Sequence, residues 1–241
     1  METRTGMAAL SEDHASGETA PALYQFSALA TDDLDDILGL YATVSASAPE
    51  GHLASRSRED FRAVLGDSAE AVAVGARQEG RLAAYSICRR CRAIPYDRAP
   101  LLDRIDPLRS RVYLGMGTVV HPRHEGRMLM ARLMALRGEA LRRLAADHVL
   151  GLVAVDNLAS IASILRAGAL LTGFSRDETA MNYVGYAGIF RELVSDQSAA
   201  TPVACADLES QRAAFASGSV IRSMRRQRDD QRVFDFVPLS D

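Results

Sequence analysis

Hydrophobic and polar residues alternate with two different periods along this chain, and the change of period predicts where helices and strands lie. Apolar residues that recur every three or four positions predict helices, and short apolar runs between turn residues predict strands. The predicted helices begin at Thr31 and at Ser57, or have apolar faces over residues 129–144 and 158–168. The predicted strands lie near residues 23–29, 71–76, 82–88, 112–120, 148–155 and 181–186.

The order of these elements predicts the fold class. A strand, two helices and three strands come first, followed by a helix, a strand, a helix and a strand. Antiparallel neighbours followed by a crossing through a helix are typical of an α/β protein (α+β, mixed sheet) with helices on both faces of a central sheet. No internal repeat is recognised in the sequence.

The distribution of periodic segments divides the chain into three parts. Residues 1–20 are rich in Ala, Ser, Gly, Thr and Glu without periodicity, which predicts a disordered leader. Residues 21–190 are expected to form one compact domain. Residues 191–241 are expected to form an extension with one helix and a last apolar strand over residues 233–237. Because a lone strand is not stable in water, it must pair with a sheet edge of this chain or of a second copy, and we expect a homodimer.

Composition and charge narrow the classes of function. Apolar residues make up 48% of the 241 residues and the formal charge is −3, which argues against general binding to nucleic acid or to an anionic membrane. Every one of the 28 basic residues is Arg, which excludes a lysine Schiff base and a P-loop lysine. The odd count of three cysteines and the lack of a secretory signal predict a cytoplasmic protein.

Cysteine chemistry and metal binding are not expected. Cys88 and Cys91 form a CxxC pair, but no second pair and no histidine pair completes a zinc site. The pair ends a predicted strand rather than opening a helix, so it does not have the context of a redox motif either.

The most informative stretch runs from Thr118 to Met130. A strand ends at Val120, Pro122 breaks it, and an amphipathic helix is expected from about Gly126. The first turn of a helix has backbone amides without partners and the positive end of the helix dipole, so it can hold a pyrophosphate. Arg123 or Arg127 can add positive charge. The alternative is a plain strand–loop–helix connection without a ligand.

A second stretch, together with the first, resembles the GCN5-related N-acetyltransferase (GNAT) family. That family has a strand ending in Val-x-Pro, as at 120–122 here, and a glycine-rich turn that opens a helix, as at 125–130. About 30 residues later it has an Asn and a Ser or Ala that open another helix ending near a glycine. Here these are Asn157, Ser160 and Gly168. The order of the predicted elements matches the family fold over residues 22–187.

The resemblance implies that acetyl-CoA or another acyl-CoA is bound where the strands at 112–120 and 148–155 separate. Two glycines in the first strand, Gly115 and Gly117, fit a bulge or a close approach of another backbone; the alternative is tight packing of a helix. In the family, an Asn at the position of Asn157 contacts the cofactor arm. Asn157 also fits the role of a helix cap. The residues expected to bind the cofactor are Val119, Val120, Arg123, Gly126, Arg127, Met128, Leu129, Met130, Asn157 and Ser160.

The groups that many family members use for catalysis are missing from their usual positions. Met116 and Gly117 stand where many relatives have a glutamate, and Ile164 stands where many have a tyrosine. Tyr183 is the substitute general acid that we consider, although a tyrosine packed in the core is the alternative. His121 and His124 flank the loop and are expected to make loop or phosphate contacts.

Sequence departures at the phosphate loop also bear on the cofactor. Glu125 stands where the family has Arg or Gln, and Met128 and Met130 stand at positions often filled by Gly or Ala.

The long segment 92–110 lies where the family folds a lid over its substrate. Tyr96 and Arg98 are the substrate-binding residues predicted there, with Arg104 an alternative clamp for a carboxylate. A solvated charged loop is the other interpretation.

We therefore expect an acyltransferase that moves an acetyl group from acetyl-CoA to an amine of a small molecule. One alternative is an acyl-CoA-binding or regulatory module without catalysis. Another is an acyltransferase for longer acyl chains or for carrier-protein thioesters, with Met116, Met128 and Met130 lining an apolar tunnel.

Overall fold

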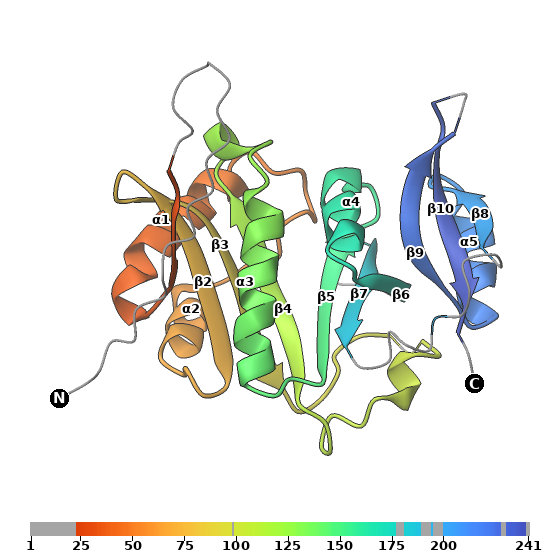
Figure 1. Cartoon of the computed structure of the whole chain (residues 1–241), viewed down its shortest axis with the longest axis horizontal. Coiled ribbons are helices and arrows are strands. Elements are labelled where there is room, and N and C mark those ends of the chain that lie inside the picture. Colours follow the sequence, from red (N-terminus) through yellow and green to blue (C-terminus); the bar gives the residue numbers. More distant parts are fainter. Residues whose placement is uncertain are drawn as a thin grey trace.

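The structure is a computed structural model that describes residues 23–97, 99–176, 181–188, 194, 200–227 and 230–239 (Figure 1). The leader expected over residues 1–20 lies outside the described residues. The strands are β1 (Gln25–Ala28), β2 (Ala71–Gln78), β3 (Arg81–Cys91), β4 (Val112–Val120), β5 (His148–Ala154), β6 (Leu170–Arg176), β7 (Met181–Gly188), β8 (Thr201–Ala204), β9 (Ser219–Arg226) and β10 (Arg232–Pro238). The α-helices are α1 (Leu34–Ser45), α2 (Arg58–Leu65), α3 (Leu129–Arg143), α4 (Leu158–Arg166) and α5 (Leu208–Ala216).

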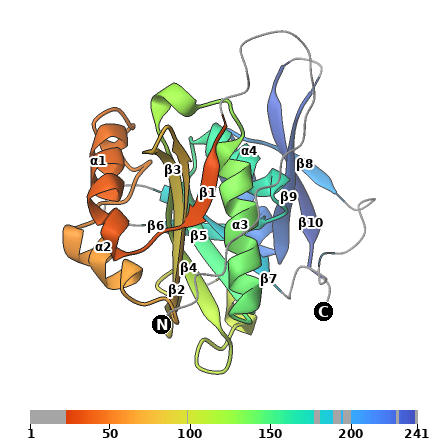
Figure 2. The same cartoon turned by 60° about the vertical axis from the view of Figure 1, so that its left-hand side comes forward.

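In the described part of the chain, ten strands form one mixed sheet in the order β1-β2-β3-β4-β5-β7-β6-β9-β10-β8. Tyr85 of β3 belongs to a buried cluster with Ile37 of α1 and Phe61 of α2. Its neighbour Ala84 belongs to a cluster with Leu133 of α3. Because successive residues of a strand point to opposite faces, α1 and α2 cover one face and α3 covers the other (Figure 2). This confirms the predicted mixed sheet with helices on both faces.

Local sequence signals set several element boundaries. The Ser57 hydroxyl accepts a hydrogen bond from the Asp60 amide at 3.1 Å, and the Asp60 carboxylate accepts one from the Ser57 amide at 2.9 Å. This capping box starts α2 as predicted. Glu79 and Gly80, with φ angles of 51° and 77°, make the tight turn between β2 and β3.

The structure contains strands that the sequence pattern does not predict, namely β6, β8 and β9. β6 follows the end of α4 so closely that its apolar residues continue the helical pattern. β8 has only four residues, one of them Pro202. β9 carries Arg222, Arg225 and Arg226 among its apolar residues, so its charge suggests an exposed crossing instead of a strand.

The segment β8-α5-β9-β10 repeats the segment β5-α4-β6-β7 at an offset of 50 residues. α4 and α5 are each nine residues long. Asn157 caps α4 by accepting a hydrogen bond from the Ser160 amide at 3.1 Å, and Asp207 caps α5 by accepting one from the Ser210 amide at 3.0 Å. The expectation of no internal repeat is therefore wrong. The repeat escapes notice because few identical residues survive, whereas capping positions and helix lengths are kept.

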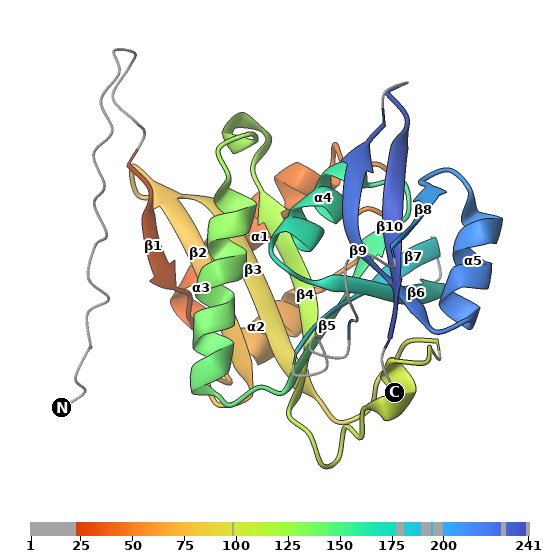
Figure 3. The same ribbon diagram turned by 45° about the vertical axis from the view of Figure 1, so that its right-hand side comes forward.

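The two repeats pack against each other with approximate two-fold symmetry. Gly168 and Gly218 follow the two helices with φ angles of 86° and 85°. Leu171 of β6 pairs with Ile221 of β9 in antiparallel register, and these two residues are equivalent in the repeat. Pairing of equivalent residues places the approximate two-fold axis between them. The sheet thus continues from β6 into the second repeat (Figure 3).

The second repeat shares the core of the rest of the protein. Residues of both repeats, among them Ile161, Leu171, Phe215 and Phe234, lie in a single buried cluster. Residues 191–241 are therefore an integral part of the sheet wherever the structure describes them, rather than an appendage.

The last strand finds its partners within its own chain. β10 pairs with β9 on one side and with β8 on the other. Of the two alternatives considered for this strand, an edge of its own chain and an edge of a second copy, the structure has the first. β8 becomes the edge of the sheet, and Pro202 within it removes a backbone donor, which is one way in which proteins protect an edge strand.

Candidate functional site

The site begins where two parallel strands separate. β4 pairs in parallel with β5 over only three residues, from Val112 opposite His148 to Leu114 opposite Leu150. Beyond this point no ladder joins the two strands within the described residues, although β4 continues to Val120 and β5 to Ala154 (Figure 1). Two strand edges with unpaired backbone groups therefore face each other, and an extended ligand can satisfy those groups.

A bulge in β4 marks the start of this separation. Ile87 of β3 lies opposite Gly117 and Cys88 lies opposite Gly115, so Met116 is the extra residue. Gly117 has a φ angle of 140°, which other residues rarely adopt, and a Cβ atom built on it would meet nothing within 4 Å. The glycine is therefore needed for the backbone conformation. This confirms the predicted bulge and excludes tight helix packing as the reason for Gly117.

Strand geometry decides which backbone groups of β4 face the separation. The His121 amide donates to the Ala83 carbonyl of the β3 side at 2.9 Å. Backbone groups alternate between the two neighbours of an antiparallel strand. Val119 therefore points its amide toward β3, and Thr118 and Val120 point theirs toward β5. Of the two valines predicted to bind the cofactor, Val120 has a suitably oriented amide, and Thr118 is a residue that sequence reasoning missed.

The loop after β4 presents free amides at the start of α3. The helix begins at Leu129, not at about Gly126, because Gly126 and Met128 have left-handed φ angles of 73° and 58°. In the part of the chain that the structure describes, no side chain caps the amides of the first turn, which include those of Leu129 and Met130. Consecutive amides around left-handed residues form a concave site for anions, and the helix dipole adds to it.

The charged side chains around this loop are exposed, and its arginines are available to a ligand. Arg123 and Arg127 are solvent-exposed, and neither forms an ion pair with a carboxylate within the described residues. Glu125 is exposed as well. Two guanidinium groups thus outnumber one carboxylate at the free amides, which leaves the loop with net positive charge.

Two histidines hold the loop in place. His121 accepts a hydrogen bond from the Arg123 amide at 3.1 Å, and His124 contacts the Tyr24 hydroxyl at 2.8 Å. Burial, followed by the positive charges of His121, Arg127 and Arg123, lowers the pKa of His124. The loop contacts expected for these histidines are confirmed.

Asn157 lies at the end of β5, across the separation from the loop. Its side-chain oxygen caps α4 through the Ser160 amide at 3.1 Å. Within the described residues the side-chain NH2 group has no partner, so it can still donate to a ligand. The helix-cap interpretation of Asn157 is thus confirmed, and it leaves cofactor contact open through the other end of the same amide.

Tyr183 does not reach the site. Its side chain is fully buried, and its hydroxyl donates a short hydrogen bond to Gln211 of the second repeat. Burial is the main reason that the pKa of Tyr183 lies well above its ordinary value. A phenol with no access to solvent or to β4 cannot protonate a leaving thiolate, so the role of general acid considered for Tyr183 is wrong.

A histidine–aspartate pair bridges the open end of the separation. His52, in the segment between α1 and α2, contacts the Asp156 carboxylate through Nε2 at 2.8 Å. Asp156 lies between the end of β5 and Asn157. Sequence reasoning missed this pair, because 104 residues separate its members and only the fold brings them together.

Arg137 of α3 lies over the sheet close to the same strands. Its guanidinium donates to the Ser86 hydroxyl at 2.9 Å, and Ser86 shares a hydrogen bond of 2.7 Å with the Thr118 hydroxyl. The helical pattern places Arg137 on the solvent face with the other arginines of the helix, and that expectation is wrong. The long side chain reaches back to the sheet and fixes the polar side chain of Thr118.

The segment predicted to be a lid, residues 92–110, is folded against the rest of the protein where the structure describes it. Tyr96 is largely buried, and this burial raises its pKa to about 12. The Asp97 amide donates to the Ser175 hydroxyl at 3.3 Å, and the Asp97 carboxylate accepts from the Arg176 amide at 3.1 Å. The segment therefore crosses to β6. Arg98, the other residue predicted to bind substrate, lies outside the described residues.

Comparison with known proteins identifies the fold. No protein-family model matches the sequence, and no curated protein matches it. Among solved structures, the acetyltransferase of the GNAT family from Streptococcus pneumoniae is similar with a TM-score of 0.54 and 13% identity, over 69% of this chain and 100% of that chain. A Salmonella typhimurium protein solved with its cofactor acetyl-CoA has a TM-score of 0.55 and 13% identity, over 73% of this chain and 99% of that one. The ribosomal-protein-S18-alanine N-acetyltransferase from Escherichia coli has a TM-score of 0.52 and 17% identity, over 69% and 94%.

These similarities show that the chain has the GNAT fold, as its sequence motifs implied. The neighbours are covered almost completely, whereas nearly a third of this chain is left over in two of the three comparisons. Residues 1–22 and 189–241 together have about that length. The uncovered part is thus long enough to hold the second repeat, whose strands and helix lie within residues 201–238.

Proposed function

We propose that this chain, which has the fold of the GNAT acetyltransferases, transfers an acyl group from acetyl-CoA to an amine of a small molecule. One observation carries the proposal: the separation of β4 and β5 leads directly to a loop of uncapped amides at the start of α3. This combination offers backbone partners for an extended arm and a positive site for a diphosphate at the end of that arm.

The residues at the separation fit such a donor. A Cβ atom built on Gly117, Gly126 or Gly151 would meet nothing within 4 Å, so these positions border open space. The amides of Leu129 and Met130, with Arg123 and Arg127 beside them, would hold the diphosphate. The Asn157 side-chain NH2 group and the Val120 amide would bind the arm. When bound, acetyl-CoA supplies the activated acyl group as a thioester.

The acceptor amine must lose a proton to attack this thioester, and we propose that His52 accepts it. An imidazole titrates near neutral pH, and a carboxylate on one ring nitrogen orients the ring so that the other nitrogen can act as a base. Asp156 provides that carboxylate at 2.8 Å from Nε2. Within the described residues Nδ1 has no partner, so it is the atom available to the amine.

Replacing His52 by glutamine should lower kcat by about 100-fold at neutral pH, which is a typical effect for removal of a general base. The KM for acetyl-CoA should change little, because His52 is not among the residues proposed to hold the diphosphate or the arm. Steady-state assays that detect the released thiol, with the amine and acetyl-CoA varied separately, would check this.

Asp156→Asn is the matched positioning variant for this pair. It should lower kcat by less than His52→Gln does, because the neutral amide can still accept a hydrogen bond from the imidazole but no longer supplies a negative charge. Unchanged kcat in His52→Gln would remove the histidine from the mechanism. It would leave the acyl-CoA site itself untouched.

The assay for the proposed function is release of the CoA thiol from acetyl-CoA in the presence of a panel of small amines. Amine-dependent release supports the proposal. CoA binding without release with any amine would favour the alternative of a non-catalytic acyl-CoA-binding module. A strong preference for long acyl chains or for carrier-protein thioesters would favour the other alternative. Met128, whose side chain is 69% exposed beside the loop, could then border an acyl channel.

Two further expectations stay predictions. In the described part of the chain, no α-helix has the length and apolar character needed to cross a bilayer, and a location in the cytoplasm is the expectation from the cysteine content. The homodimer also stays a prediction, although β10 finds its strand partners within its own chain.

A further inference from the structure

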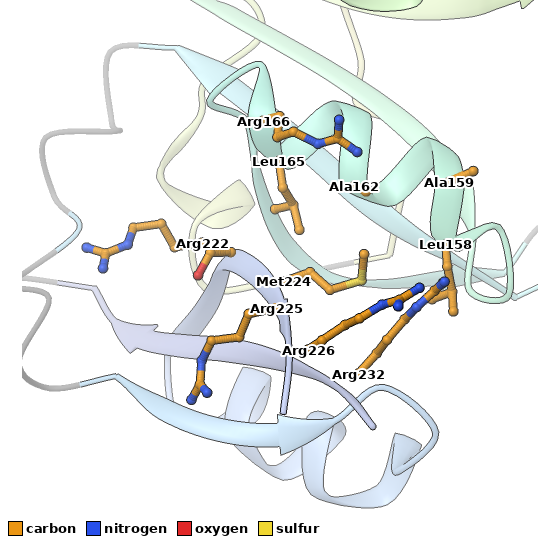
Figure 4. Close-up of a pocket in the computed structure, with 11 residues that line it drawn as sticks. Leu158, Ala159, Ala162, Leu165, Arg166, Arg222, Met224, Arg225, Arg226 and Arg232 are labelled. Carbon is orange, nitrogen blue, oxygen red and sulfur yellow. The ribbon is translucent and has the colours of Figure 1, made fainter. Parts of the chain in front are cut away.

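A groove lies between α4 and the second repeat, away from the phosphate loop. It has a volume of about 590 Å³, within the range of small-molecule sites. Apolar side chains of α4 form one wall, and Met224 of β9 lies opposite (Figure 4). The apolar lining consists of Leu158, Ala159, Ala162, Leu165 and Met224.

The rest of the lining is strongly basic. Five arginines and no acidic residue line the groove: Arg166, Arg222, Arg225, Arg226 and Arg232. Two of them are neutralised by carboxylates outside the lining, because Arg225 pairs with Asp235 at 3.0 Å and Arg226 pairs with the exposed Asp230 at 3.1 Å. In the part of the chain that the structure describes, the other three form no ion pair. The groove therefore carries uncompensated positive charge.

Two of these arginines are aimed at the apolar wall. Arg226 and Arg232 are directly opposite each other in the pairing of β9 with β10. Their side chains run side by side toward Leu158, whereas those of Arg222 and Arg225 point away from α4 (Figure 4). Like charges directly opposite each other in a sheet destabilise it. An anion between the two guanidinium groups would relieve this repulsion, in competition with the exposed Asp230 that pairs with Arg226.

The two-fold symmetry of the repeats provides an internal comparison. The equivalent position between α5 and β6 is filled, because Phe174 packs edge-on against Phe215 at 5.2 Å and the Arg212 guanidinium covers the Phe174 ring at 5.7 Å. In the open groove the residue equivalent to Arg212 is Ala162, and the residue equivalent to Phe174 is Met224. An open groove is therefore not a necessary result of packing two such repeats.

We propose that this groove binds a phosphate monoester with an apolar or aromatic body, as a site separate from the acyl-CoA site. Arg226 and Arg232 would hold the phosphate, which carries between one and two negative charges at neutral pH. The apolar wall of α4 and Met224 would contact the body. The limited volume favours one small molecule over a polymer such as RNA. A nucleotide and an alkyl phosphate share this chemistry.

Calorimetric titrations with adenosine monophosphate, hexyl phosphate and inorganic phosphate test the proposal on the full chain in saturating CoA. At least one of the organic phosphates should bind with a stoichiometry of one and at least tenfold more tightly than inorganic phosphate. Which of the two binds better distinguishes a nucleotide from an alkyl phosphate. Raising the NaCl concentration should weaken the binding.

Two variants test the walls of the groove separately. The double variant Arg226→Gln/Arg232→Gln should weaken binding of the organic phosphate by about 100-fold, or about tenfold for each charged hydrogen-bond donor. Ala162→Phe should fill the groove and weaken binding of the organic phosphate by about tenfold or more. Arg142→Gln and Ala135→Phe, two exposed positions on α3, are the matched controls and should bind as the wild type does.

Several results would overturn the proposal. These are no saturable binding of either organic phosphate, equal affinity for inorganic phosphate, or unchanged affinity in the double variant. Displacement of the ligand by CoA would also overturn it, because the ligand would then occupy the acyl-CoA site. CoA binding is measured separately in these titrations, so failure of the acyl-CoA site does not count against the groove. If Ala162→Phe does not fold, the double arginine variant decides.

Discussion

Replacing Gly126 by valine is expected to weaken CoA binding by about 100-fold or more. The φ angle of 73° at this position is strained for any side chain and worst for a β-branched one. Valine would move the backbone out of the left-handed region and turn the following amides away from the ligand. Hydrogen bonds to a charged group contribute about 1.5–3 kcal/mol each, so the loss of two of them accounts for the expected change.

Gly138→Val is the matched control for this measurement. Gly138 lies within α3, and a Cβ atom there would meet nothing within 4 Å, so the same substitution should leave CoA affinity unchanged. Calorimetric titration of both variants with CoA measures the difference. Equal affinities in Gly126→Val and Gly138→Val would mean that the diphosphate is not held by this loop.

Replacing Phe234 by alanine is expected to destabilise the whole protein by about 3–5 kcal/mol, the usual cost of removing a buried phenylalanine side chain. Phe234 in β10 is completely buried, and its ring packs edge-on against Tyr183 of β7 at 5.7 Å. The second repeat thus contributes directly to the core of the first. For a chain of this size the midpoint of thermal unfolding should fall by roughly 6–20 °C in a single transition.

Phe26→Ala is the matched control at the opposite end of the sheet. Phe26 lies in the edge strand β1 and is only partly buried, so its replacement should cost clearly less. Thermal unfolding followed by calorimetry distinguishes the two cases. A separate, low-temperature transition that alone responds to Phe234→Ala would show that the second repeat folds independently of the rest.

The parts of the fold that could be predicted have strong local signals. The capping box at Ser57 starts α2, and the bulge at Gly117 appears in the sequence as a pair of glycines within an apolar strand. The phosphate loop was predicted for the same reason, since its glycine and proline mark a turn between a strand and a helix. The left-handed conformation of Met128 was not, because methionine rarely adopts it.

The parts that could not be predicted depend on contacts between distant residues. His52 meets Asp156 only because the sheet brings the α1–α2 connection to the end of β5. Tyr183 is an ordinary strand tyrosine in the sequence, and only the fold shows that the second repeat covers its hydroxyl with Gln211. The repeat can be seen in the cap positions and in the helix lengths. The exposed arginines of β9 obscure the pattern of apolar residues that would indicate a strand there.

The measurement that tests the account most directly is a calorimetric titration of the full chain with acetyl-CoA, combined with thermal unfolding. The account predicts saturable binding with a stoichiometry of one. At 100 times its dissociation constant the ligand should add about 2.7 kcal/mol to the free energy of unfolding, which corresponds to a rise of roughly 5–11 °C in the unfolding midpoint. No heat of binding and no change of the midpoint at millimolar acetyl-CoA would contradict an acyl-CoA site between β4 and β5.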